Sequence, residues 1–327
     1  ASNLSAALDR ATRALLGIRL VLDARVLSQK LTGTERVVIE LLRALVGVNR
    51  ISRIRVLVTG RVPEYVKEML PEGREKVEFV TGGTGFEDDE ILFRPYQVGT
   101  IKELDEIRQA NWLLIHQLDF IAFHNRSYFS TAKEWIKYRD STRFALSVAD
   151  GVTFLSKEIK RFGQSDLLTD RSKSNKVIYA GVDHFSRVRS SCPVSEVKRL
   201  AGKEELILCI GTAYTHKNRM LALEIWKEMR IKGFKGDIVL AGATPPFGSS
   251  SAYESEFVVA NPDLANGVHD LGEISESEKY WLYSKSVLVL HPTLSEGFGL
   301  VPFEAAEAGV PVLSTRQGSL DEVLPSG

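Results

Sequence analysis

The 327-residue chain has little that would build a metal centre or a disulfide framework. Its two cysteines, Cys192 and Cys209, lack the spacing of metal ligands, which argues against structural zinc and against a disulfide-stapled fold. The six histidines include no i, i+4 pair that would present two ligands on one helix face. We therefore expect no protein-built metal site and no cofactor.

Long apolar runs and an excess of one charge are also missing. The longest apolar stretch, residues 112–123, is too short to span a bilayer and is interrupted by His116, Gln117 and Asp119. The 42 basic and 42 acidic side chains cancel, which disfavours nucleic acid as a partner. Without a recognisable signal peptide, the expected location is cytoplasmic, either free or peripheral to the inner membrane.

What the sequence does contain is the pattern of two α/β domains. From Ile18 onward, short β-rich runs alternate with longer amphipathic stretches, which is typical of a parallel sheet covered by helices on both faces. We expect strands at residues 18–22, 54–58, 77–80, 112–115, 152–155, 176–178, 206–210, 238–241, 268–271, 287–290 and 310–313. The expected helices are 35–46, 131–149, 219–230, 276–284 and 300–308.

The periodicity breaks at residues 179–191, where a glycine, several charges and two serines predict a linker. The expected domains are Rossmann-like units at 17–185 and 186–327, behind a helical extension at 1–16. The second unit is expected to lack its closing elements. In the first unit, residues 133–139 mix basic and aromatic side chains, and they either touch a membrane surface or pack their aromatics on the sheet.

The most informative stretch is residues 291–305, HPTLSEGFGLVPFEA, which follows a predicted strand and enters a helix. Gly297 and Gly299 let the backbone approach a ligand closely, and the free N–H groups of the first helical turn favour an anion such as a diphosphate. Glu296 and Glu304 are suited to accept hydrogen bonds from sugar or ribose hydroxyls. The alternative is an ordinary strand-to-helix turn with a solvated glutamate.

Two other strand-to-helix turns carry weaker signals. In residues 210–218, IGTAYTHKN, Lys217 lies near a helix start at the usual ligand edge, although a lone lysine there is often only a solvated charge. The third motif is Asp23-Ala24-Arg25 followed by residues 31–36, LTGTER, in which the turn at Gly33 opens a helix after the first strand, as single glycines commonly do. His116, in the segment HQLD, either serves the site or caps a buried strand end.

In this order and spacing, the three motifs resemble those of the family 4 retaining glycosyltransferases, also called glycosyl transferases group 1. Seven residues separate Glu296 from Glu304, as in the E-x7-E signature of that family, and the surrounding EGFGL and PFEA carry most of the resemblance. Weaker agreements occur at residues 149–152, 180–183, 211–218, 272–275 and 309–312. The resemblance implies an α/β fold of the GT-B type, in which two Rossmann-like domains face each other across a cleft. The first would hold the acceptor and the second the donor.

The resemblance also implies residue roles. The donor sugar and diphosphate would contact Glu296 and the backbone of 297–300, the ribose would contact Glu304, and the leaving phosphates would contact Lys217. Many relatives have an arginine where this chain has Thr212, and many carry a His-Asp pair, which leaves open whether His116 or Asp119 takes that place. The implied catalytic residues are Lys217, Glu296 and His116, and the implied donor-binding residues are Gly33, Thr34, Gly211, Thr212, Lys217, Ile274, Glu296, Gly297, Phe298, Gly299, Leu300 and Glu304.

The activity that the resemblance implies is metal-independent transfer of a hexose from GDP-mannose or a UDP-hexose to a glycan or lipid-linked acceptor. The expected setting is bacterial surface polysaccharide synthesis, with the anomeric configuration retained. No carboxylate nucleophile for a double displacement stands out. The resemblance implies a same-face mechanism, in which the leaving phosphate helps to deprotonate the acceptor. Two alternatives stay open: a sugar-nucleotide epimerase on the same fold, and a non-catalytic module of a longer polypeptide.

Overall fold

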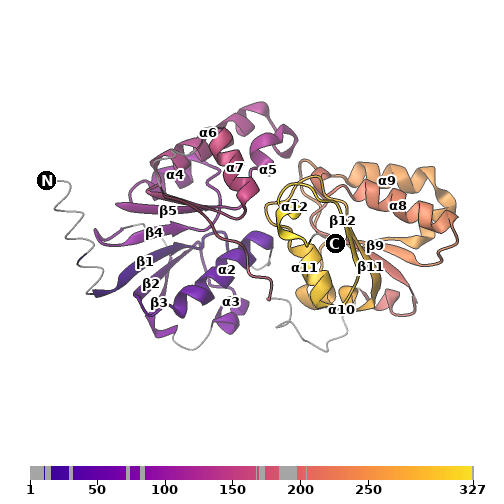
Figure 1. The fold of residues 1–327 in the computed structure, drawn as a ribbon, viewed down its shortest axis with the longest axis horizontal. Coiled ribbons are helices and arrows are strands. Elements are labelled where there is room, and N and C mark those ends of the chain that lie inside the picture. Colours follow the sequence, from indigo (N-terminus) through magenta and orange to yellow (C-terminus); the bar gives the residue numbers. More distant parts are fainter. Residues whose placement is uncertain are drawn as a thin grey trace. The chain divides into compact units, whose positions relative to one another are not determined.

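The computed structural model describes residues 11, 16–28, 32–70, 74–81, 85–166, 168, 174–183, 197–203 and 205–325. The chain divides into two compact units, one formed by residues 1–123 and 132–180 and the other by 124–131 and 181–327 (Figure 1). The expected helical extension at 1–16 and most of the expected linker at 179–191 lie outside the described residues. The domain limits 17–185 and 186–327 stay predictions.

The first unit contains a seven-stranded sheet in the order β3-β2-β1-β4-β5-β6-β7, in which every pairing is parallel. Its strands are β1 (Ile18–Asp23), β2 (Ile51–Val58), β3 (Val77–Thr81), β4 (Ile91–Arg94), β5 (Trp112–Gln117), β6 (Gly151–Phe154) and β7 (Ser174–Val177). Its helices are α2 (Gly33–Val46), α3 (Glu64–Met69), α4 (Ile101–Ile107), α5 (Ile121–His124), α6 (Ala132–Val148) and α7 (Lys157–Ser165). Figure 1 shows α2 and α3 on one side of the sheet, with α4, α6 and α7 on the other.

Strand β4 is the element of this sheet that the sequence analysis missed. It has four residues, Ile-Leu-Phe-Arg, and ends in Arg94, whose side chain is only 1% exposed. A buried arginine is costly unless it is paired. Here Asp23 at the end of β1 and Glu103 on α4 both pair with Arg94. A local sequence pattern does not reveal such partners, because they come from other parts of the chain.

The expected helix at 131–149 is confirmed as α6. The aromatic residues of its 133–139 segment contact the first unit, whereas Phe144 is exposed. Tyr138 packs against the core of the first unit, and Trp135 donates its indole N–H to the carbonyl oxygen of Phe123 at 3.1 Å. The second of the two interpretations of residues 133–139 is therefore the one that the structure supports. Within the described residues, no helix has both the length and the apolar composition needed to cross a membrane.

The second unit contains a five-stranded parallel sheet in the order β10-β9-β8-β11-β12. Its strands are β8 (Leu206–Ile210), β9 (Asp237–Ala241), β10 (Val268–Asp270), β11 (Ser286–His291) and β12 (Val312–Ser314). Its helices are α8 (Arg219–Ile231), α9 (Ser251–Ala260), α10 (Glu276–Lys285), α11 (Leu300–Glu307) and α12 (Leu320–Val323). All five strands were expected from the sequence, whereas α9 was not.

The core of this unit surrounds β8 and β9, which are buried at every position. Burial on both faces explains their continuous apolar sequences, because helices cover both sides of a parallel sheet. Trp226 of α8 is fully buried and donates its indole N–H to the carbonyl oxygen of Gly236 at 3.0 Å. The packed core fixes the carboxyl ends of the central strands, from which the candidate site is built.

A segment from within the expected first domain, residues 124–131, clusters with the second unit. The ring of Tyr128 lies 4.7 Å from that of Tyr214, centroid to centroid. Gly248 has a φ of +68°, and a Cβ added there would lie 2.2 Å from the Tyr128 ring. Glycine is needed at position 248 both for the left-handed backbone and for this close approach.

Candidate functional site

The carboxyl ends of β8 and β11 are neighbours, because these two strands pair in parallel. Loops that follow parallel strands emerge at the same edge of a sheet, which is the usual ligand edge of such folds. The loop after β8 carries Lys217 in a single 3-10 turn, Thr215–Lys217, and the loop after β11 carries Glu296. Two sequence motifs 79 residues apart therefore lie at one edge.

Lys217 and Glu296 form an ion pair, with 2.6 Å between Nζ and Oε1. Glu296 is 8% exposed, and Nε2 of the buried His291 lies 3.2 Å from the same oxygen. Burial alone would raise the pKa of Glu296, but the Lys217 ammonium and the nearby His291 hold that pKa well below its ordinary value. Glu296 is therefore a carboxylate at neutral pH, with its charge balanced by Lys217.

The two loops are also joined through their backbones. The carbonyl oxygen of His216 accepts hydrogen bonds from the Leu294 N–H at 2.7 Å and from the Thr293 hydroxyl at 3.0 Å. On the other side of Glu296, the Ser319 hydroxyl donates to the carbonyl oxygens of Glu296 and Gly297, at 2.9 and 2.8 Å. These bonds hold the carboxylate in one place before any ligand arrives.

The side chain of His216 is anchored by the 124–131 segment. Its Nδ1 is hydrogen-bonded to the Tyr128 hydroxyl, and its ring stacks on that of Tyr214 at 5.7 Å. Burial, and then the charge of Lys217, lowers the pKa of His216 to about 4. His216 is thus neutral at neutral pH, and Tyr128 holds the turn that carries Lys217. The sequence analysis did not identify Tyr128, because a single tyrosine far away in the sequence gives no local signal.

Helix α11 begins beside Glu296 with an N-terminus that no side chain caps. Its N-cap residue, Gly299, has a φ of +88°, and a Cβ there would lie 2.4 Å from Leu320 Cδ2. The neighbouring Phe298 is 6% exposed and stacks on Phe303 at 5.4 Å. Uncapped N–H groups and the positive end of the helix dipole favour a bound phosphate. The role expected for residues 297–300 stays a prediction.

Glu304 lies in α11 but belongs to a different cluster. Its Oε1 accepts from Lys279 Nζ at 2.8 Å and its Oε2 from the Tyr283 hydroxyl at 2.9 Å, both on α10. Glu304 is 4% exposed. Burial, and next the charge of Glu304, raises the pKa of Tyr283 far above its ordinary value, so its hydroxyl stays a donor. The sequence analysis missed Lys279 and Tyr283, whose i, i+4 spacing on one helix face was the available signal.

Arg219 is the buried cation nearest in sequence to Lys217. It is 1% exposed, donates to the carbonyl oxygens of Gly211 and Gly242, and lies 3.5 Å from Glu254. Because its guanidinium is directed at these internal acceptors, it braces the loop after β8.

The remaining donor-binding candidates occupy loop and helix-start positions. Gly33 and Thr34 open α2, where Thr32 and Glu35 form a capping box. A Cβ added to Gly33 would meet no atom within 4 Å, so packing within the first unit does not require glycine there. Ile274 is partly buried against the core of the second unit. The assigned roles of these residues stay predictions.

His116 is 3% exposed on β5, with Nδ1 hydrogen-bonded to the Thr153 hydroxyl at 2.8 Å. Burial lowers its pKa to about 4, so the imidazole is neutral at neutral pH. Asp119 is partly exposed and accepts from Gln97 Nε2 at 3.2 Å and from the Ile121 N–H at 2.8 Å. The contacts of His116 are those of a residue that caps a strand inside the unit, and its catalytic role stays a prediction.

Comparison with known proteins shows that the second unit is similar to a known protein family. Residues 194–327 match the family model described as glycosyl transferases group 1. The chain is 27% identical over 148 residues to the O-antigen chain mannosyltransferase RfbU of Salmonella typhimurium, covering 44% of this chain and 39% of that protein. It is 30% identical over 159 residues to the lipopolysaccharide core biosynthesis mannosyltransferase LpsB of Rhizobium meliloti, covering 47% and 44%. The alignments thus span less than half of these two curated relatives.

A solved structure shows the fold of nearly the whole chain. Anabaena HepE, in complex with UDP and glucose, has a TM-score of 0.63 and 19% identity, over 95% of this chain and 84% of that chain. This likeness and the two parallel α/β sheets confirm the expected GT-B class.

The Lys217–Glu296 ion pair predicts a pH-dependent contribution to stability. The pKa of Glu296 in the folded protein lies below its ordinary value of 4.5, so its contribution is complete above about pH 4.5 and is lost as the pH falls further. We expect Glu296→Gln to lower the free energy of unfolding by about 2 kcal/mol near neutral pH, with the deficit shrinking steadily in acid. Urea denaturation of both proteins across this range measures the deficit, and a deficit independent of pH would contradict the prediction.

Proposed function

We propose that this chain, whose residues 194–327 match the family model of the glycosyl transferases group 1, transfers a hexose from a nucleotide-diphosphate sugar to a glycan or lipid-linked acceptor. The observation that carries the proposal is the pairing of Lys217 with Glu296 beside the uncapped start of α11. That arrangement offers a cation and free N–H groups to a diphosphate, and a carboxylate to the sugar.

The proposed donor is GDP-mannose or a UDP-hexose, and the proposed setting is bacterial surface polysaccharide synthesis. The names of two similar proteins, mannosyltransferases of O-antigen and of lipopolysaccharide core, support the setting. The presence of UDP and glucose in the HepE structure supports a nucleotide-linked hexose.

The proposed chemistry retains the anomeric configuration. As the bond from the anomeric carbon to the phosphate oxygen breaks, the acceptor hydroxyl attacks from the same face and its proton passes to the leaving phosphate. Lys217 and the first turn of α11 stabilise the charge that develops on the diphosphate, because they are fixed before the reaction starts. Glu296 faces the positive charge that builds on the sugar ring.

We propose a cytoplasmic location, with contact to the inner membrane surface when the acceptor is lipid-linked. Trp135 and Tyr138 of α6 do not support this contact, because the Trp135 indole is bonded to the Phe123 carbonyl oxygen and Tyr138 packs against the core of the first unit.

The direct test uses the purified chain with UDP, GDP and the corresponding nucleotide hexoses. Calorimetric binding of a nucleotide, together with hydrolysis or transfer of its sugar, is the expected result. Nucleotide binding without any turnover would instead favour the non-catalytic module, and neither binding nor turnover would remove the proposal.

The role of Lys217 can be separated from its pairing with Glu296 by a double-mutant cycle. We expect Lys217→Ala to lower kcat by roughly 10²-fold, as for the loss of one fixed electrostatic donor. A similar loss should follow when Lys217→Ala is added to Glu296→Gln, because the leaving phosphates still need the cation. Lys232→Ala, an exposed lysine at the end of α8, is the matched control. No further loss in the Glu296→Gln background would show that Lys217 only neutralises Glu296.

Glu304 is proposed to bind the ribose, which does not change during the reaction. We therefore expect Glu304→Gln to raise the donor KM by roughly 10-fold with a smaller effect on kcat, as for uniform binding of ground and transition states. Glu276→Gln is the matched control, since Glu276 contacts the same Lys279 at 3.4 Å. Steady-state kinetics of the two variants decide the matter, and a kcat defect without a KM change would refute the ribose assignment.

Gly33 is proposed to approach the reaction centre, where a methyl group would interfere. Because a Cβ at Gly33 meets nothing within 4 Å, Gly33→Ala should leave the melting temperature unchanged or slightly raised. Turnover should fall roughly 10-fold or more, since small displacements of bound reactants are costly. Gly85→Ala, at a site equally open to a Cβ, is the control. Full activity of Gly33→Ala would show that the turn lies away from the reacting atoms.

A further inference from the structure

The turn that carries Lys217 has to hold a flexible side chain in place. A lysine ends in an ammonium on a four-carbon stem, so the direction of its charge depends on how firmly the backbone beneath it is fixed. Lys217 closes the turn Thr215–Lys217, and the loop after β9 supports the start of this turn. The Thr215 N–H donates to the carbonyl oxygen of Gly248, and the Ser250 N–H donates to that of Ala213, both at 2.8 Å.

A second support comes from residues 124–131, which precede α6 in the sequence and cluster with the second unit. The Tyr128 hydroxyl of this segment is hydrogen-bonded to Nδ1 of His216, the middle residue of the turn. The centroid of the Tyr128 ring lies 4.7 Å from that of Tyr214 and 5.8 Å from that of His216. Tyr128 therefore contacts the turn both through a polar bond and through ring packing.

The place of the Tyr128 ring is set by packing and not only by the hydroxyl group. Gly248 leaves room for the ring, since a Cβ added there would lie 2.2 Å from Tyr128 Cδ1. The same glycine accepts the Thr215 N–H, so one residue contacts both the tyrosine and the turn. A ring that is seated in this way should keep its position when the hydroxyl is removed, which makes Tyr128→Phe the loss of a single bond.

His216 connects Tyr128 to both motifs of the candidate site. Its imidazole bonds to Tyr128, and its carbonyl oxygen accepts two hydrogen bonds from the loop after β11. Lys217 is the next residue, and its ammonium pairs with Glu296 at 2.6 Å. A shift of His216 therefore moves the ammonium of Lys217, and small displacements of a group that acts on the reacting atoms are costly to the rate.

We propose that Tyr128 is a positioning residue of the candidate site, which acts through His216 to hold the Lys217 ammonium toward the leaving phosphates. Its effect on sugar transfer rests on the proposed function, whereas its effect on the binding of a diphosphate does not. A merely structural tyrosine would stabilise the second unit without a specific connection to Lys217. The two roles therefore differ in what the loss of the hydroxyl does when Lys217 is absent.

Steady-state kinetics of Tyr128→Phe give the first test. We expect kcat to fall roughly 10-fold with a smaller change in the donor KM, because a misplaced Lys217 fails mainly in the transition state. Tyr253→Phe, at an exposed tyrosine of α9, is the matched control and should keep the wild-type kcat. An unchanged kcat in Tyr128→Phe would overturn the proposal.

Two further variants separate positioning from a structural role. His216→Phe removes the other partner of the same bond, and combining it with Tyr128→Phe should cost no more kcat than either change alone. In the Lys217→Ala background, Tyr128→Phe should cause no further loss, because the group that it positions is gone. Thermal melts of all variants exclude unfolding as the cause. A further loss of similar size in the Lys217→Ala background would show a role independent of Lys217 and would overturn the proposal.

Calorimetric titration with inorganic pyrophosphate separates this proposal from the proposed function, because the probe carries a diphosphate without a sugar or a nucleoside. We expect pyrophosphate to bind the whole chain, with its Kd raised by Lys217→Ala and, by a smaller factor, by Tyr128→Phe. If the chain binds pyrophosphate but transfers no sugar, the transferase proposal fails and this titration decides the role of Tyr128. A Kd that Tyr128→Phe leaves unchanged, or no binding of pyrophosphate at all, would then overturn that role.

Discussion

The candidate donor site depends on one buried ion pair, in which Lys217 neutralises Glu296. Removing either charge from water without the other would cost free energy. The loop that carries Lys217 and the loop that carries Glu296 therefore stabilise each other. The bonds from Leu294 and Thr293 to the His216 carbonyl make the same connection through the backbone. The consequence for chemistry is preorganisation, because a cation and an anion already held in place need little rearrangement when charge develops on a ligand.

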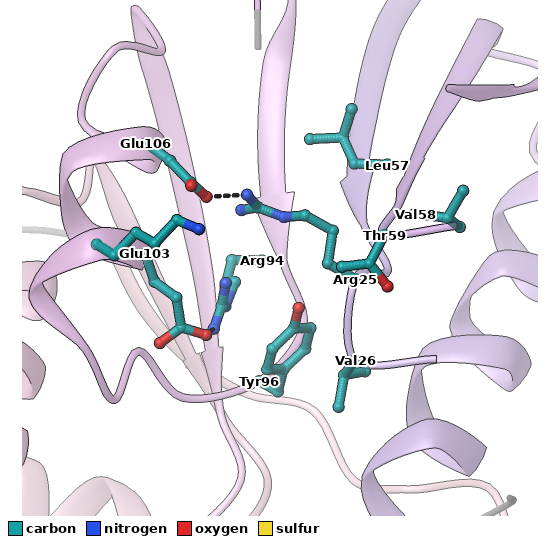
Figure 2. Close-up of a pocket in the computed structure, with 10 residues that line it drawn as sticks. Arg25, Val26, Leu57, Val58, Thr59, Arg94, Tyr96, Glu103 and Glu106 are labelled. Atoms are coloured by element: carbon teal, nitrogen blue, oxygen red, sulfur yellow. Dashed lines mark hydrogen bonds and ion pairs between the residues drawn. The ribbon is translucent and has the colours of Figure 1, made fainter. Parts of the chain in front are cut away.

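The parallel sheets set the position of the paired charges in both units. In the second unit, Lys217 and Glu296 lie in the loops that follow β8 and β11, at one edge of the sheet. In the first unit, Asp23 and Arg94 lie at the ends of β1 and β4, at the corresponding edge. The difference lies in what the charges do. Asp23 and Arg94 are almost fully buried and serve mainly to hold the strand ends, whereas Arg25 and Glu106, which pair above them at the wall of a cavity (Figure 2), are less buried.

The sequence predicts most strands of this fold, because buried parallel strands consist of short apolar runs. It fails where stability comes from distant partners: β4 ends in an arginine whose charge is balanced by Asp23 and Glu103. The candidate site, too, was predicted only in part. The motifs around Lys217 and Glu296 were recognisable from glycines and charges near helix starts, but their mutual pairing was not. Tyr128 was missed because its contact with His216 spans 88 residues.

The two glutamates of the E-x7-E signature are held in different ways, which bears on what each can do. Glu296 sits in a loop and shares one oxygen with Lys217 and His291, so a ligand phosphate that attracts Lys217 also changes the surroundings of Glu296. Glu304 sits in a helix, and its two oxygens accept from Lys279 and Tyr283. These two bonds from one helix fix the orientation of the Glu304 carboxylate. A carboxylate held in one orientation suits a part of the ligand that stays constant, whereas a carboxylate paired with the cation that faces the leaving phosphates suits the part that reacts.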